Sequence, residues 1–135
     1  MKFRMMILAL FTLFSIQPAF AAKPIEDLID VPIPARVDNS RMSLEDVKEA
    51  IIAGCRYKGW APVLVEEGRF EASIHVRKHF AKVEIPFDAN TYSIRYLDSQ
   101  NLDFDPEKRK IHRNYNKWVI LLSEAIQREF AGRVQ

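Results

Sequence analysis

The 135-residue sequence has little of what most catalytic and metal sites are built from. It contains one cysteine, three histidines and four glycines, and no two glycines are adjacent. One cysteine excludes an intramolecular disulfide and a paired-cysteine metal site. The sequence also has no Gly-rich phosphate loop and no serine in a nucleophile-elbow motif. We therefore expect no cofactor.

An excess of one charge is also lacking. The chain has 20 basic and 18 acidic residues, a formal net charge of +2. The excess comes from Lys2 and Arg4, which lie in a predicted leader. Without them the chain is formally neutral, so nothing in the charge points to a nucleic-acid partner.

The first 21 residues predict a secretory signal peptide. Two basic residues precede an apolar run over residues 5–16, and Ala19-Phe20-Ala21 is a small-x-small cleavage site. The run is too short for a membrane span. No cysteine follows the site to take a lipid, so we expect no membrane anchor. Cleavage near Ala21 predicts a periplasmic or secreted protein.

The mature chain divides into an arm and a domain. Residues 22–41 contain three prolines and show no clear period, which predicts an extended N-terminal arm, mobile or laid along the surface. Residues 42–135 predict an α+β domain. Its first helix begins after Ser43 as N-cap and ends near Gly59. Gly54 predicts close packing of this helix on the sheet.

Three strands follow, over residues 69–77, 80–87 and 91–98, because apolar and polar side chains alternate there. Residues 60–66 predict a fourth strand, placed at a sheet edge because Pro62 cannot donate to a ladder. A second helix begins at Asp105-Pro106-Glu107 or a few residues later. The fold class is therefore α+β: a two-layer sandwich ordered helix, four-stranded antiparallel meander, helix, with both helices on the apolar face.

Two groups of polar residues are candidate ligand or partner contacts. The first is the polar sheet face with His75, Arg77 and Arg95. Such a face can bind a peptide, glycan or protein, or it can simply be solvated with cross-strand ion pairs.

The second group lies after the third strand and around the start of the second helix. Asn114 or Asn116 is expected to bond the loop backbone between residues 98 and 104, and a ligand role is the alternative. A metal site would need the histidines to converge with a carboxylate. The candidates in this group are His79, Tyr96, Asn101, His112 and Asn114.

Several stretches have a familiar arrangement. They are Gly59-Trp60 after a helix, Arg77-x-His79-x-Ala81-x-Val83-x-Ile85, Tyr92-Ser93-Ile94-x-Tyr96-x-Asp98-Ser99-x-Asn101-Leu102, and the segment from Ile111 to Trp118. Together they make most of the mature chain resemble a family of small uncharacterised exported proteins of Proteobacteria. Many members are described only as candidate lipoproteins. The resemblance implies export but supplies no reaction and no catalytic residues.

The absence of catalytic motifs favours a non-enzymatic periplasmic binding or interaction module. Its partner would be a protein, a peptide or a small ligand, and a homodimer through a sheet edge or face is a further expectation. The alternative is a small hydrolase or metal-dependent enzyme that uses His79 and His112. Cys55 lies on the apolar stripe of the first predicted helix, so we expect an inert core thiol.

Overall fold

The computed structural model describes residues 22–135. The predicted signal peptide and its cleavage site lie outside these residues. The elements are, in chain order, β1 (Lys23–Pro24), β2 (Leu28–Pro32), α1 (Leu44–Tyr57), β3 (Ala61–Glu66), β4 (Arg69–Val76), β5 (His79–Pro86), β6 (Thr91–Gln100), β7 (Lys110–Ile111) and α2 (Asn114–Ala131). No helix in this part of the chain is long and apolar enough to cross a membrane.

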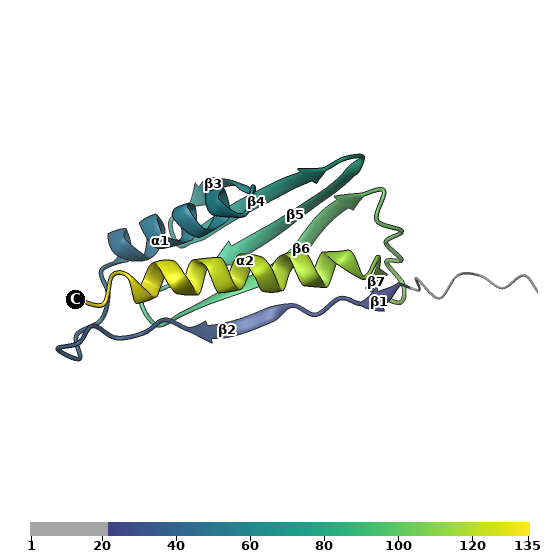
Figure 1. Cartoon of the computed structure of the whole chain (residues 1–135). Helices are drawn as coiled ribbons and strands as arrows, with labels where there is room; N and C mark the ends of the chain where they lie inside the picture. Colours follow the sequence, from purple (N-terminus) through teal and green to yellow (C-terminus); the bar gives the residue numbers. More distant parts are fainter. Residues whose placement is uncertain (1–21) are drawn as a thin grey trace, which may run out of the picture.

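Five strands form the main sheet in the order β2-β6-β5-β4-β3, and each neighbouring pair is antiparallel. Both helices lie side by side on one face of this sheet (Figure 1). The predicted α+β class, the antiparallel meander and the two layers are confirmed. Pro62 lies in the edge strand β3, and Pro86 is the last residue of β5.

The core lies between the sheet and the helices. Phe70, Val83, Ile85 and Ile94 are at most 1% exposed, as period-2 alternation predicts for the covered face. α1 begins as expected, because the Ser43 hydroxyl accepts the backbone N–H of Asp46. The helices pack against each other at Gly54, where an added Cβ would lie 2.7 Å from the Ile126 backbone. The prediction that Gly54 packs on the sheet is therefore wrong.

The arm, which its sequence predicts to be extended without regular pairing, supplies the strand β2. β2 pairs with β6 and makes the sheet five-stranded rather than four-stranded. Its register shifts between Leu28 and Val31, so two apolar residues three positions apart both pair with inward-facing residues of β6. This bulge hides the alternation by which a strand is recognised.

The second helix begins later than Asp105. The Asp105 carboxylate accepts the backbone N–H groups of Glu107 and Lys108, as an N-cap would, but the chain then turns back. Arg109 has φ +49°, outside the helical region, and an Asp105–Lys110 bridge closes the turn. The aspartate thus caps a turn, and α2 begins at Asn114.

Candidate functional site

The sheet face opposite the helices carries a network of ionic side chains. Glu71 and Glu84 lie directly opposite each other on β4 and β5. Arg69 bridges them, with its guanidinium 3.5 Å from Glu71 and 3.8 Å from Glu84. A cation between two facing carboxylates relieves their repulsion. The expected cross-strand ion pairs are therefore present on this face.

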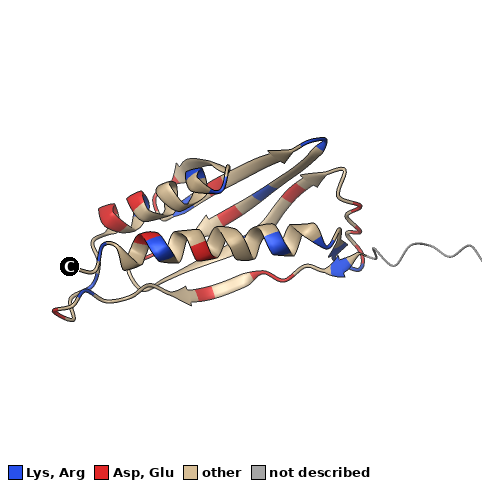
Figure 2. Cartoon of the chain, in the orientation of Figure 1, with Lys and Arg blue, Asp and Glu red and all other residues tan. Residues whose placement is uncertain are grey.

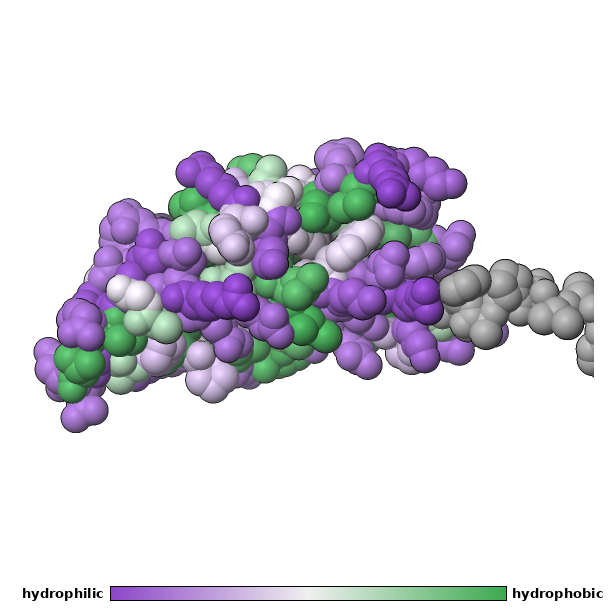
Figure 3. All heavy atoms as spheres, in the orientation of Figure 1, coloured by the Kyte–Doolittle hydropathy of each residue, from purple (hydrophilic) through white to green (hydrophobic). Residues whose placement is uncertain are grey.

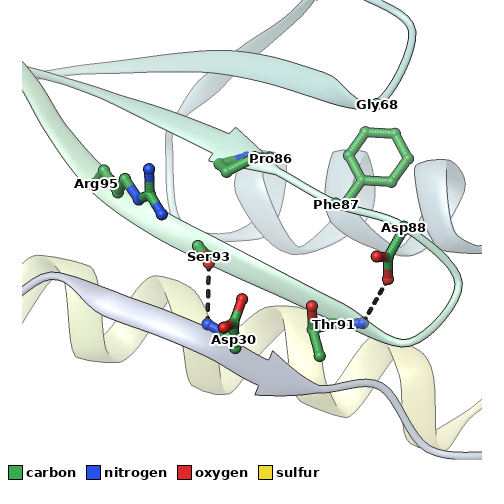
Figure 4. A pocket seen from close by; sticks show the side chains of 8 residues that line it. All are labelled: Asp30, Gly68, Pro86, Phe87, Asp88, Thr91, Ser93 and Arg95. Atoms are coloured by element: carbon green, nitrogen blue, oxygen red, sulfur yellow. Dashed lines mark hydrogen bonds between the residues drawn. The ribbon is translucent and has the colours of Figure 1, made fainter.

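Near β2 the same face is hollowed. A shallow cavity of about 250 Å³ opens between β2, β6 and the end of β5 (Figure 4). A cavity of this size admits a small polar group or a few residues of a peptide rather than a large ligand. Its lining is mostly polar and consists of Asp30, Gly68, Pro86, Phe87, Asp88, Thr91, Ser93 and Arg95.

Asp30 reaches the hollow because of the bulge in β2. Its backbone has φ +51°, a left-handed conformation that aspartate tolerates better than most residues. Its N–H donates to the Ser93 hydroxyl on β6 at 2.9 Å. Bulges re-aim side chains in this way. The Asp30 side chain lies beside Ser93 and Thr91, and Arg95 lies further along β6 beyond Ser93 (Figure 4).

Arg95 was a predicted contact residue, and it is exposed on β6 opposite Glu84. Within residues 22–135 neither its guanidinium nor the Asp30 carboxylate forms an ion pair. Arg95 and Asp30 thus give the hollow a cation and an anion that have no ion-pair partner among the described residues. Together they can hold opposite charges of a ligand, with a guanidinium well suited to a carboxylate.

The far wall of the hollow carries a second carboxylate. Asp88 accepts the backbone N–H groups of Thr91 and Asn90, and these bonds lower the pKa of its carboxyl below its usual value. Asp88 is therefore charged at neutral pH. Because its Oδ1 accepts both of these N–H groups, we assign Asp88 to holding the β5–β6 connection, which was predicted at residues 88–90.

The predicted group around the second helix converges only in part. The rings of His79 and His112 lie 6.1 Å apart, and Trp118 lies 6.4 Å from His79. His79 Nδ1 contacts the Asn101 carbonyl at 2.6 Å, and the Asn101 amide donates to the Lys78 carbonyl at 2.7 Å. These bonds tie the β4–β5 turn to the end of β6, so the group has a structural task.

His112 also serves the backbone. The backbone N–H of His112 donates to the Leu102 carbonyl at 2.8 Å. The ring Nδ1 of His112 accepts the backbone N–H of Asn114, the first residue of α2. The helix has no side-chain cap bond at Arg113, and the His112 ring satisfies the N–H of the first helical residue, which lacks an intrahelical partner. The described residues contain no cluster of three or more His, Cys, Asp or Glu able to hold a metal ion.

The remaining predicted contacts lie apart from one another. Tyr96 stacks on Phe104 at 4.4 Å beneath the helices. His75 lies on the open face against Phe80, at 4.8 Å between ring centres. Arg77 was predicted to lie on the polar sheet face. It lies instead in the β4–β5 turn, after the end of β4, with φ +56°.

The predicted asparagine clamp has a different partner. Asn116 donates to the Pro24 carbonyl at 2.8 Å and accepts the N–H of Glu26 at 3.0 Å. It holds the arm rather than the loop of residues 98–104, which was the expected target. The backbone of His112 holds that loop instead.

Comparison with known proteins adds no relative. No family model matches the chain, and no curated protein and no solved structure gives a significant match.

Proposed function

We propose that the mature chain is an exported, non-enzymatic binding module and that its binding site is the hollow on the open sheet face. The observation that carries this is the pair of free opposite charges, Arg95 and Asp30, beside one small cavity. Both helices lie on the other face, so a ligand can approach without displacing them.

The ligand class follows from the lining. Arg95 suits a carboxylate, and Asp30 suits an ammonium group or a peptide N–H. Pro86 adds a flat apolar surface beside them. We infer that the site takes a short zwitterionic peptide or the end of a protein chain. Export rests on the predicted signal peptide and on the resemblance to exported proteins.

The histidines favour this function over an enzyme. The Nδ1 atoms of His79 and His112 each contact a backbone group. The β4–β5 turn and the start of α2, which carry these two rings, lie at the end of the sheet away from the hollow (Figure 1). Catalysis by a histidine usually places a carboxylate or a nucleophilic side chain within hydrogen-bond reach of the ring. Within residues 22–135 neither ring forms a hydrogen bond or an ion pair with a carboxylate, a hydroxyl or a thiol.

Backbone NMR with a model peptide tests the site. We would titrate the mature protein with trialanine to about 10 mM, a range suited to a weak site. The amides of Asp30, Ser93 and Arg95 should shift together. Trialanine with an acetylated amino end and an amidated carboxyl end is the matched control and should shift them less. Equal shifts with both peptides, or shifts spread over the helices, would contradict the proposal.

A further inference from the structure

Ser93 is the buried polar residue in the lining of the hollow. Its exposed fraction is only 4%, whereas Asp30, Asp88 and Arg95 are exposed. Arg95 follows Ser93 by two positions in β6, and residues two apart in a strand lie on the same face of the sheet. In Figure 4 Ser93 lies between Asp30 and Arg95. A buried hydroxyl therefore lies between the two charged groups of the proposed site.

The Ser93 hydroxyl has a hydrogen that no group of the described chain accepts. Its oxygen accepts the Asp30 backbone N–H at 2.9 Å. Among residues 22–135 this is the hydrogen bond that the hydroxyl forms, and a serine can donate one more. A buried donor without an acceptor is costly, so such groups are satisfied by water or by a ligand. Because Ser93 lines the hollow, that acceptor comes from the hollow.

The neighbouring groups favour a carboxylate as this acceptor. The Arg95 guanidinium forms no ion pair within residues 22–135 and is well suited to a carboxylate. A carboxylate has two oxygens, so it can accept from the guanidinium and from the hydroxyl at the same time. A peptide carbonyl has one oxygen and no net charge, so it would satisfy these two donors less well.

We propose that the Ser93 hydroxyl donates to the carboxylate of the bound ligand beside Arg95 and thereby selects the free carboxyl end of a peptide. The inference rests on the proposed function and adds the residue that determines specificity. Ser93 then accepts from Asp30 and donates to the ligand. Because hydrogen bonds in a chain polarise one another, the ligand strengthens the bond from the Asp30 N–H.

Two half-blocked peptides test the role of Ser93 by NMR titration. Acetyl-trialanine has a free carboxylate and a blocked amino end, and trialanine amide has the reverse. Ser93→Ala should weaken binding of acetyl-trialanine at least about tenfold, as expected for a lost bond to a charged group. Trialanine amide should lose less, because it has no carboxylate. Ser73→Ala removes a hydroxyl on β4 outside the lining, between buried Ala72 and Ile74, and should leave both affinities unchanged.

Hydrogen exchange in the parent gives a second readout that needs no variant. Saturation with acetyl-trialanine should slow exchange of the Asp30 amide more than saturation with trialanine amide does. Equal slowing by the two peptides overturns the proposal. So does an equal loss of affinity for both peptides in Ser93→Ala, which would show that Ser93 only holds Asp30, or no loss at all. In these cases the hollow still binds peptides. A parent that binds neither peptide overturns the proposed function as well.

Discussion

At the scale of single residues, the cysteine is the simplest case. Cys55 is buried in α1, as expected, and burial raises the pKa of its thiol to about 12. We predict no reaction with Ellman's reagent in the folded protein at pH 8, and one thiol per chain in urea. Reaction of the folded protein at the rate of the unfolded chain would show that the helix opens freely.

The Cys55 thiol also predicts that the free energy of unfolding depends on pH in the alkaline range. The folded pKa lies above the ordinary thiol value of 9.0, so the neutral thiol favours folding below pH 9. This contribution is lost as the pH rises from 9 towards 12. Urea unfolding across that range should show a smaller alkaline loss in Cys55→Ala than in the parent, compared as changes from each protein's own value at pH 8.

His112 predicts an effect on the start of α2. Its Nδ1 accepts the N–H of Asn114, the first residue of the helix, where backbone donors lack an intrahelical partner. His112→Ala removes this acceptor and should speed amide hydrogen exchange at residue 114. His112→Asn, whose side chain can still accept, is the matched control and should exchange more slowly than His112→Ala. Equal exchange in the parent and in His112→Ala would contradict this role of the ring.

At the scale of elements, the helix pair depends on Gly54. An added methyl group would lie 2.7 Å from Ile126 backbone atoms, which cannot move away cheaply. Gly54→Ala should cost about 1–3 kcal/mol of unfolding free energy, although alanine favours helix. Gly132→Ala is the control, because its Cβ would make ordinary contacts beyond 3.5 Å. Chemical denaturation compares them, and an unchanged Gly54→Ala would contradict tight packing.

The arm is the second element with a defined anchor. Asn116 holds Pro24 and Glu26 by two exposed hydrogen bonds, so Asn116→Ala should cost no more than about 1.5 kcal/mol. It should speed amide exchange at Glu26 selectively. Asn114→Ala is the control, because Asn114 bonds His112 through its backbone N–H. This variant should leave amide exchange at Glu26 unchanged. If both variants behave alike, Asn116 does not anchor the arm.

The elements also show what a sequence can and cannot predict. The alternation of apolar and polar residues predicted the meander, and Pro62 predicted that β3 lies at an edge of the sheet. β2 was missed because its bulge at Asp30 breaks the period. Asp105 was misread because capping a turn and capping a helix use the same side-chain bonds. In each miss the deciding contact is a local departure from regular geometry.

The hollow could be predicted only in part for a related reason. Arg95 and Ser93 belong to a strand that alternation reveals. Asp30 joins them from 63 residues away through the Ser93 hydroxyl. No local pattern signals that contact. The predicted group of histidines was found near one end of the sheet, but its hydrogen bonds serve the backbone.

At the scale of the whole molecule, the fold places the hydrophobic core and the hollow on opposite faces of the main sheet. Charges of both signs are spread over helices and strands (Figure 2). On the helix side, apolar surface lies in separate areas among polar ones (Figure 3). The core closes one face of the sheet, and the other face carries the ion pairs and the hollow. A binding site on the open face can therefore change without disturbing the core.

The central claim is that Arg95 and Asp30 bind a zwitterionic ligand in the hollow. Calorimetric titration with trialanine tests it on Arg95→Ala, with Lys82→Ala as a cation control on the same face. We predict at least about a tenfold loss of affinity for Arg95→Ala and an affinity near that of the parent for Lys82→Ala. Equal affinities in all three proteins, or no binding by the parent, would contradict the account.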